Sequence, residues 1–472
     1  MSQGPEPLAQ PGGAQPGDPG GVDMRTVADL MREEERAFEA AHPLSKQSYE
    51  RGLGCFLYGA PMHWMQQWPG PYPITVADAH GARLTDVDGN EYVDFALGDT
   101  AAMFGHANPV VAEAVCTQIG RGSTMMLPTE DAAWVGEELA RRFGLPYWQV
   151  TTSATDANRF VIRLCRMFTG RDKIVTFNWN YHGSVDETQV EFDETGAMVP
   201  RTGVHPNAVH HESTTRLVEF NDVAGLEEAL AHGDVACVLT EPLLTNIGMV
   251  PALPGFHDAL RRLTREHGVP LVIDETHTIS TGPGGYTRAH GLEPDFLVVG
   301  KSLAGGIPVA VWGASQDMAE RIWRVLPHFR TGEAINHFGF GGTLAGSALQ
   351  MAAIRATLER VMTDETFARM AGRAERFEQG VLGVFARRRL PWHVTRIGAR
   401  VEYLFRPDPP RNGGEAHHAR HPVLEACIHL YLLNRGVLLT PFHNMALMCP
   451  FTTDEDVDLH TRLLDGCLAE IV

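Results

Sequence analysis

The stretch PLVIDETHTISTGPGG, residues 270–285, contains a short apolar run that ends abruptly in two acidic residues, Asp274 and Glu275. Further apolar runs of this kind cover residues 147–153, 173–179, 235–242, 296–301 and 309–315, and helical patterns alternate with these runs. Near-continuous apolar strands with helices between them are typical of a mostly parallel sheet that is covered on both faces. We therefore predict an α/β fold, in which ligands bind beyond the ends of the strands.

The 472 residues are enough for a large core and more than one domain. Residues 1–22 are rich in proline and glycine, and we expect them to form a disordered tail. Residues 106–348 contain the apolar runs and are predicted to form a large ligand-binding domain. Residues 349–472 are rich in helical patterns and are predicted to form a smaller α+β domain, to which the segment 23–105 is also assigned.

The net charge of −19 argues against nucleic acid and anionic membranes as partners, because both repel an acidic surface. No apolar run reaches the length of about 18 residues that a membrane helix needs. The seven cysteines form no CxxC pair, which argues against a disulfide framework and a metal site. We therefore expect a cytoplasmic protein without a bound metal.

Lys301 directly follows the apolar run that begins at residue 296, and a loop with two adjacent glycines comes after it. Desolvation at such a strand end favours the neutral amine of a lysine, which attacks carbonyl groups. The alternative is a surface lysine whose aliphatic stem lies along apolar groups.

Two further strand ends carry polar groups. Asp274 lies at the tip of an apolar run, where a carboxylate needs strong donors or a cationic partner such as a protonated heterocycle. Ser153, Ala154 and Thr155 lie where a strand pattern passes into a helical one, and free N–H groups at the start of a helix attract phosphate. The alternatives are a carboxylate that caps the next turn and an ordinary N-cap.

Together these features describe one ligand. Pyridoxal 5′-phosphate has an aldehyde for Lys301, a basic ring nitrogen for Asp274 and a phosphate group for residues 153–155. Any one feature arises easily by coincidence, whereas the combination does not. We therefore predict pyridoxal phosphate as the cofactor.

With these residues in place, the sequence resembles the class III pyridoxal-phosphate-dependent aminotransferases, and within them the glutamate-1-semialdehyde 2,1-aminomutase-like branch. The resemblance runs from about residue 70 to the C-terminus. It is carried by motifs in the expected order: LTDVDGNEYVDFALGDTAAMFGHANP (84–109), TTSATDANRFVIRLCRMFTGRDKIVTFNWNYHG (151–183), LTEPLLTNIGMVPALPGFHDALRRL (239–263), VIDETHT (272–278), VVGKSLAGGIPVAVWG (298–313), FGGTLAGSALQMAA (340–353) and RGVLLTPFHN (435–444).

The resemblance implies fold type I, with a mostly parallel seven-stranded sheet flanked by helices in the large domain and a smaller α+β domain. It implies that Lys301 forms a Schiff base with the cofactor and moves protons, and that Asp274 pairs with the ring nitrogen. For the remaining cofactor-binding residues it implies that Ser153, Ala154 and Thr155 hold the phosphate, Tyr181 covers the ring, Glu241 and Asn246 lie beside it, and Thr343 reaches the phosphate of a neighbouring subunit. Such sharing implies a homodimer.

The sequence departs from the family pattern at three positions. Ala154 stands where the phosphate turn usually has glycine, and Thr276 stands under the ring in place of valine. His277 replaces methionine or glutamine near the ring oxygen, where it either influences the cofactor or simply takes over the donor role of glutamine.

Substrates of this family usually carry a carboxylate, and Arg400, in the strand pattern IGARVEYLF, is the candidate that binds it. Trp64, in GAPMHWMQQWPGPYP, is a candidate wall of the substrate pocket. The alternatives are a surface charge for Arg400 and a purely structural role for Trp64.

We predict a class III transaminase that moves an amino group between an amino acid or amine donor and an oxo acid acceptor, both small molecules. The alternatives are an aminomutase of the glutamate-1-semialdehyde type, a racemase or decarboxylase that uses the same lysine, and a protein of this fold without transaminase activity. A stoichiometric need for a keto acid would distinguish a transaminase from the other enzymes.

Overall fold

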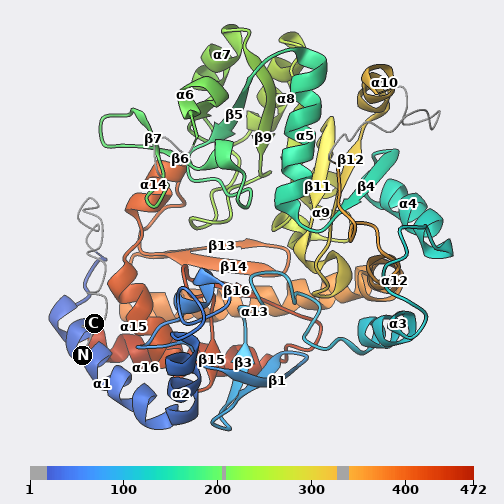
Figure 1. Cartoon of the computed structure of the whole chain (residues 1–472). Helices are drawn as coiled ribbons and strands as arrows, with labels where there is room; N and C mark the ends of the chain where they lie inside the picture. Colours follow the sequence, from blue (N-terminus) through green and yellow to red (C-terminus); the bar gives the residue numbers. More distant parts are fainter. Residues whose placement is uncertain (1–18, 205–208, 327–339) are drawn as a thin grey trace.

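The computed structural model describes residues 19–204, 209–326 and 340–472, so residues 1–18 of the predicted tail lie outside the described residues. A seven-stranded sheet dominates the upper part of the molecule (Figure 1). Its strands, in spatial order, are β4 (Tyr147–Thr151), β12 (Ala310–Ala314), β11 (Phe296–Val299), β10 (Leu271–Asp274), β9 (Val235–Thr240), β5 (Lys173–Phe177) and β8 (Thr215–Val218).

The sheet is mostly parallel, as predicted. Strand β12 runs antiparallel to both of its neighbours, β11 and β4, while the remaining pairs are parallel. The carboxyl ends of the parallel strands therefore lie along one edge of the sheet. This edge brings together the polar residues that follow β4, β9, β10 and β11.

Side chains alternate between two cores along the strands, as the geometry of a strand requires. In β10, Val272 faces one core and its neighbours Leu271 and Ile273 face the other. Helices α5 (Ala154–Thr169) and α10 (Gln316–Val325) cover the first face. The second face is covered by α4 (Glu130–Phe143), α7 (Val223–Ala231) and α8 (Phe256–Glu266). Both faces are thus buried, which explains the unbroken apolar runs.

The lower part of the molecule joins the two ends of the chain (Figure 1). Strand β15 (Val437–Leu438) pairs in parallel with β3 (Glu91–Asp94) and completes a sheet with β1 (Val76–His80) and β2 (Arg83–Asp86). A second sheet contains β13 (His393–Ile397), β14 (Arg400–Leu404) and β16 (Met445–Leu447). The helices here are α1 (Met24–Ala41), α2 (Pro43–Gly52), α13 (Asp364–Arg388), α15 (Pro422–Leu433) and α16 (Asp454–Ile471). The domain boundaries after residues 105 and 348 stay a prediction.

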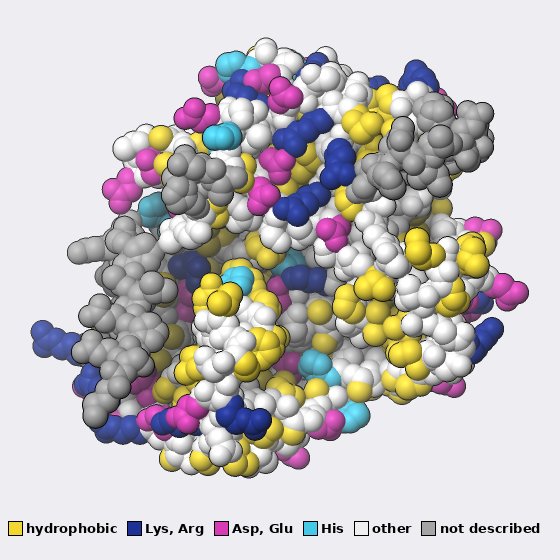
Figure 2. All heavy atoms as spheres, viewed as in Figure 1, with side chains coloured by type: hydrophobic (Ala, Val, Ile, Leu, Met, Phe, Trp, Pro, Cys, Tyr) yellow, Lys and Arg dark blue, Asp and Glu magenta, His cyan; other side chains and the backbone are white. Residues whose placement is uncertain are grey.

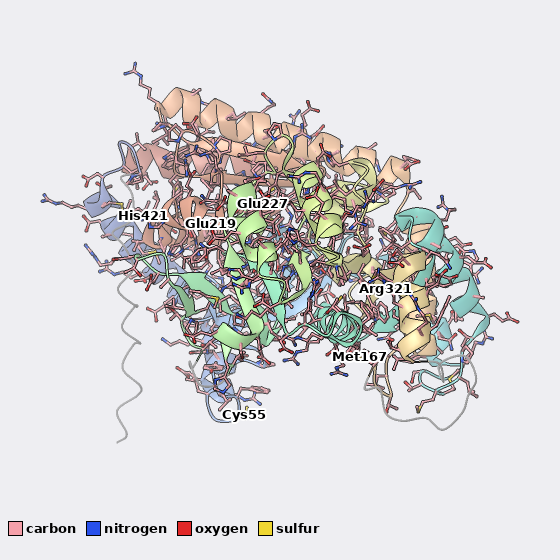
Figure 3. The ribbon with its side chains drawn as sticks, turned by 90° about the horizontal axis from the view of Figure 1, so that it is seen from above. Cys55, Met167, Glu219, Glu227, Arg321 and His421 are labelled. Atoms are coloured by element: carbon pink, nitrogen blue, oxygen red, sulfur yellow. The ribbon has the colours of Figure 1, made fainter. Side chains whose placement is uncertain are left out.

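The seven cysteines are free thiols, and five of them are buried. Cys55 lies at the outer edge of the molecule (Figure 3). In the part of the chain that the structure describes, none of the helices combines the length and apolar character needed to cross a bilayer. The cytoplasmic location stays a prediction.

Candidate active site

A cavity of about 290 Å³ opens at the carboxyl edge of the large sheet. On the face seen in Figure 2, the surface is hollowed between the upper and lower parts of the molecule. Most of the predicted cofactor-binding residues line the cavity: Ser153, Ala154, Thr155, Tyr181, Glu241, Asp274, Thr276, His277 and Lys301. Residues that end or follow five separate strands, β4, β5, β9, β10 and β11, therefore converge on one space.

Asp274, the last residue of β10, is held by hydrogen bonds to both of its carboxylate oxygens. Asn158 Nδ2 and His182 Nδ1 donate to Oδ2 over 2.8 and 3.0 Å, and the backbone N–H and hydroxyl of Thr276 donate to Oδ1 over 3.0 and 2.6 Å. Burial opposes the charge of Asp274, but these donors and the charge of His182 outweigh it and lower the pKa of the carboxyl. The cavity thus contains an ionised, oriented carboxylate.

Ser153 is the N-cap of α5: its hydroxyl accepts a hydrogen bond from the Asp156 N–H over 3.1 Å. The N-cap interpretation of this turn is therefore correct, and the same turn leaves the first N–H groups of a 16-residue helix facing the cavity. Ala154 begins the helix, so the alanine imposes no strain there. Gly183 closes this end with a φ of 70°, and a Cβ atom there would overlap the hydroxyl of Thr155.

Lys301 begins the short helix η4 (Lys301–Ala304) directly after β11, with a left-handed φ of 51°. Its Nζ lies 2.5 Å from Asp99 Oδ2 and forms a short contact with His277 Nε2. The amine is therefore held in the cavity rather than extended along the surface.

His277 is part of a buried hydrogen-bond chain. Its Nδ1 lies 2.6 Å from the hydroxyl of Thr245, and that hydroxyl forms a short hydrogen bond with the Glu241 carboxylate. This chain assigns the ring proton to Nδ1, so Nε2 is free to accept a hydrogen bond from Lys301. Burial, reinforced by the charge of Lys301, lowers the pKa of His277 to about 4, so the ring is neutral at pH 7.

Arg400 is fully buried in β14, so it is not a surface charge. Its Nη2 donates a short hydrogen bond to the hydroxyl of Thr100, while Nε and Nη1 have no partner among the described residues. Arg400 is absent from the described lining of the cavity, but a buried guanidinium with two donor atoms unused is suited to an anion.

The other predicted residues lie around this centre. The Trp64 ring meets the Tyr181 ring edge to face at 6.5 Å between centroids and packs on Phe442 at 5.3 Å. Asn246 is half-buried and is absent from the described lining of the cavity, and Thr343 lines a separate surface hollow. The roles of Asn246 and Thr343 stay predictions.

The second acid of the opening stretch has a different position. Glu275 is fully buried and accepts hydrogen bonds from the Thr278 hydroxyl and from the backbone N–H groups of Tyr286 and Thr287. Burial raises the pKa of this carboxyl. Glu275 therefore holds the chain that follows β10, while Asp274 faces the cavity.

The residues present fit pyridoxal phosphate. Asp274 offers a negative charge to a protonated ring nitrogen, the start of α5 offers N–H groups to a phosphate, and Lys301 offers an amine to an aldehyde. Sequence reasoning did not identify Asp99, Asn158, His182 or Thr245. For Asp99, the one local sign is an acidic residue within the mostly apolar stretch FALGDTAAMFG.

Comparison with known proteins gives the family. The profile described as Aminotransferase class-III matches residues 64–468. The chain belongs to the class III aminotransferase family. A glutamate-1-semialdehyde 2,1-aminomutase from Desulfitobacterium hafniense is 30% identical over 424 residues, which cover 88% of this chain and 95% of the relative.

Solved structures similar to this chain include an aminomutase and an aminotransferase. A glutamate-1-semialdehyde-aminomutase from Pseudomonas aeruginosa PAO1 is 68% identical, with a TM-score of 0.94, over 96% of this chain and 100% of that protein. A variant of it was solved in complex with PMP. A β-phenylalanine aminotransferase from Variovorax paradoxus is 25% identical, with a TM-score of 0.82, over 93% of this chain and 97% of that protein. The predicted family, fold type I and pyridoxal phosphate cofactor are thereby confirmed.

Proposed function

We propose that this class III enzyme is an aminomutase of the glutamate-1-semialdehyde 2,1 type, which moves an amino group between neighbouring carbons of one substrate molecule. The observation that carries the proposal is the meeting of Lys301, Asp274 and the start of α5 in one cavity, in a chain similar to aminomutases over most of its length. The substrate and its isomer have the same atoms, so the reaction needs no external amino acceptor.

Bound in the cavity, pyridoxal phosphate supplies an aldehyde that reacts with amines and a ring that withdraws electrons from the amine-bearing carbon. Asp274 keeps the ring nitrogen protonated, because its carboxylate is ionised and fixed by four hydrogen bonds. The N–H groups of residues 154 and 155 hold the phosphate.

Lys301 Nζ is placed to accept the proton of the amine-bearing carbon and to donate a proton in the reverse direction. The neutral His277 ring supports this role, because Nε2 accepts a hydrogen bond from Nζ while Thr245 and Glu241 fix the opposite side of the ring. His277 thus positions the lysine amine and stays uncharged throughout the neutral pH range.

Arg400 binds the substrate carboxylate through Nε and Nη1, the two donors that remain free beside the Thr100 hydroxyl. Tyr181 lines the cavity and offers its ring as cover for the cofactor ring, and Trp64 packs edge to face against Tyr181 from outside the described lining. A carboxylate and an amine held at two fixed points orient the substrate carbons between them.

The second candidate is a transaminase, which is the function predicted from the sequence. Thr276 and His277 depart from the family pattern, and the aminotransferase from Variovorax paradoxus has a similar fold. The names of the relatives found at 30% and 68% identity favour the aminomutase over this candidate.

The test is incubation of the cofactor-loaded protein with glutamate-1-semialdehyde in the absence of any keto acid. We expect the amino ketone isomer to form in an amount equal to the substrate consumed, and Lys301→Ala to abolish its formation. Turnover that appears only when a keto acid is added, and consumes that acid stoichiometrically, would establish the transaminase instead.

A further inference from the structure

Asp99 contacts the reactive amine of the site, although the mechanism above does not use it. Asp99 Oδ2 lies 2.5 Å from Lys301 Nζ and 3.6 Å from His277 Nε2. Its other oxygen, Oδ1, is buried and has no hydrogen-bond partner among the described residues. A buried carboxylate oxygen without a donor is costly, so a functional reason for this placement is needed.

The backbone that carries Asp99 is strained. Leu97, Gly98, Asp99 and Thr100 have φ values of 45°, 57°, 49° and 83°, so four successive residues adopt the left-handed region. Residues other than glycine adopt this region at a cost of about 1 to 2 kcal/mol each. The strained turn delivers Asp99 to Lys301 and the next side chain, Thr100, to Arg400.

The turn itself does not use the Asp99 carboxylate. The N–H groups of Ala96 and Leu97 are bound by Asp94, and the Asp99 N–H donates to the Ala96 carbonyl over 2.9 Å. Within the described part of the chain, the Asp99 carboxylate accepts its hydrogen bond from Lys301 Nζ. The charge therefore serves the cavity and not the local fold.

The groups around Asp99 come from several elements. Lys301 from η4, His277 after β10 and Arg400 from β14 favour the ionised form of Asp99. Asp99 also interacts electrostatically with Tyr181. Arg400 interacts electrostatically with Asp99, Glu241 and Glu402. Burial opposes the charge of Asp99, but Lys301 and Arg400, together with His277 when its ring is protonated at low pH, hold the pKa of the Asp99 carboxyl well below the usual range. Asp99 is therefore a permanent negative charge beside the amine.

We propose that Asp99 is a further catalytic residue, whose carboxylate stabilises positive charge on the nitrogen at the Lys301 position, first that of the lysine and then that of the substrate amine. The inference rests on the proposed role of Lys301, and it holds for an aminomutase and a transaminase alike. In this site Arg400 then binds the negative carboxylate of the substrate, and Asp99 binds its positive amine.

The test compares Asp99→Asn, Asp99→Glu and the unchanged protein. Asparagine tolerates left-handed backbone, so Asp99→Asn removes the charge and keeps the turn. Asp99→Gly removes the charge in the same way and replaces Asp99→Asn if that variant does not fold. Asp234→Asn is the matched control, because Asp234 also pairs with a cation, Arg216, but lies at the opposite end of β9 from the cavity.

The first measurement uses the cofactor-free protein and follows acetylation of Lys301 against pH by peptide mass spectrometry. We expect the pH of half-maximal labelling to fall by about 1 to 3 pH units in Asp99→Asn, because an ammonium loses its counter-charge. Asp99→Glu should move it less, and Asp234→Asn should leave it in place. The second measurement, the pH midpoint of the visible absorption of the loaded protein, should move in the same direction.

Equal midpoints in Asp99→Asn and the unchanged protein would overturn the proposal. A shift as large in Asp99→Glu as in Asp99→Asn would also overturn it, because charge would then not be the cause. These readouts do not depend on the product formed, so they fail independently of the proposed aminomutase activity.

Discussion

Replacing Asp274 by asparagine tests the proposed hydrogen bond between this carboxylate and the nitrogen of the cofactor ring. The carboxylate accepts four hydrogen bonds, two from Asn158 and His182 at Oδ2 and two from Thr276 at Oδ1. An asparagine of the same shape has one oxygen and one NH₂ group, so it satisfies the donors on one side and opposes those on the other. The substitution thus removes the charge and disturbs the support around it.

The expected magnitudes follow from this geometry. A hydrogen bond to a charged group contributes about 1.5 to 3 kcal/mol and a neutral one about 0.5 to 1.5 kcal/mol. The hydrogen bond between residue 274 and the ring nitrogen therefore contributes about 1 to 2 kcal/mol less to the free energy of cofactor binding in the variant. This corresponds to cofactor affinity weakened by about 5- to 30-fold. Donors left facing the NH₂ group lower the free energy of unfolding by about 1 to 3 kcal/mol. Turnover falls further, by about 100-fold or more, because the neutral side chain cannot hold the ring proton.

The assay is a titration of cofactor-free protein with pyridoxal phosphate, followed by absorption, together with the rate of turnover at saturating cofactor. Asn158→Ala is the graded control, since it removes one donor to Asp274 and leaves the charge in place. It should weaken cofactor binding less than Asp274→Asn does. Cofactor affinity and turnover that are unchanged in Asp274→Asn would refute the assignment of Asp274 to the ring nitrogen.

Three further predictions concern acid stability, the substrate carboxylate and assembly. Burial lowers the pKa of His277 and His429 to about 4 and that of His460 to about 3, below the ordinary value of 6.5. The unfolded chain therefore binds more protons between pH 6.5 and 4, and stability is lost as the pH falls through this window, by about 2 kcal/mol per histidine at pH 5. Urea unfolding at pH 8 and pH 5 measures this loss of stability. The variant His460→Phe should lose about 2 kcal/mol less than the unchanged protein between these pH values. Equal stability of the unchanged protein at both pH values would contradict the prediction. Arg400→Met should raise the KM for a carboxylate substrate by about 10- to 100-fold and barely change that for an amine without a carboxylate, and equal effects on both would contradict the assignment. Exposed hydrophobic side chains gather on the side of α3 (Pro109–Ile119) and α4. The side chains of Met126, Leu127 and Leu344, which are 77%, 70% and 60% exposed, lie near the hollow lined by Thr343. Light scattering should give twice the chain mass of 51.8 kDa, Leu344→Glu should weaken the dimer, and a monomeric mass for the unchanged protein would contradict the shared active site.

Local sequence patterns predicted the strands that consist of an unbroken apolar run. Strands β10 and β11 are buried on both faces, so their apolar runs and the residues at their ends, Asp274 and Lys301, could be read directly. Strand β8, with the sequence TRLV, has no unbroken apolar run and was not predicted. The short strands β15 and β16, of two and three residues, carry too little pattern.

Contacts across long sequence separations could not be read in this way. Asp99 and Lys301 are 202 residues apart, and Asn158 and His182 reach Asp274 across 116 and 92 residues. Asn158 and His182 have no special local pattern, Asp99 has only its apolar surroundings, and only the folded chain brings the three side chains together. The sequence therefore indicated the reactive groups, whereas the groups that hold them required the structure.

The most direct measurement locates the lysine that bonds to the cofactor. The protein loaded with pyridoxal phosphate is reduced with borohydride, digested, and mapped by mass spectrometry. We predict that the cofactor mass is found on the peptide that contains Lys301, and that Lys301→Ala removes it while the variant still binds the cofactor reversibly. Attachment to a different lysine, with Lys301 unmodified, would contradict the assignment of this cavity as the active site.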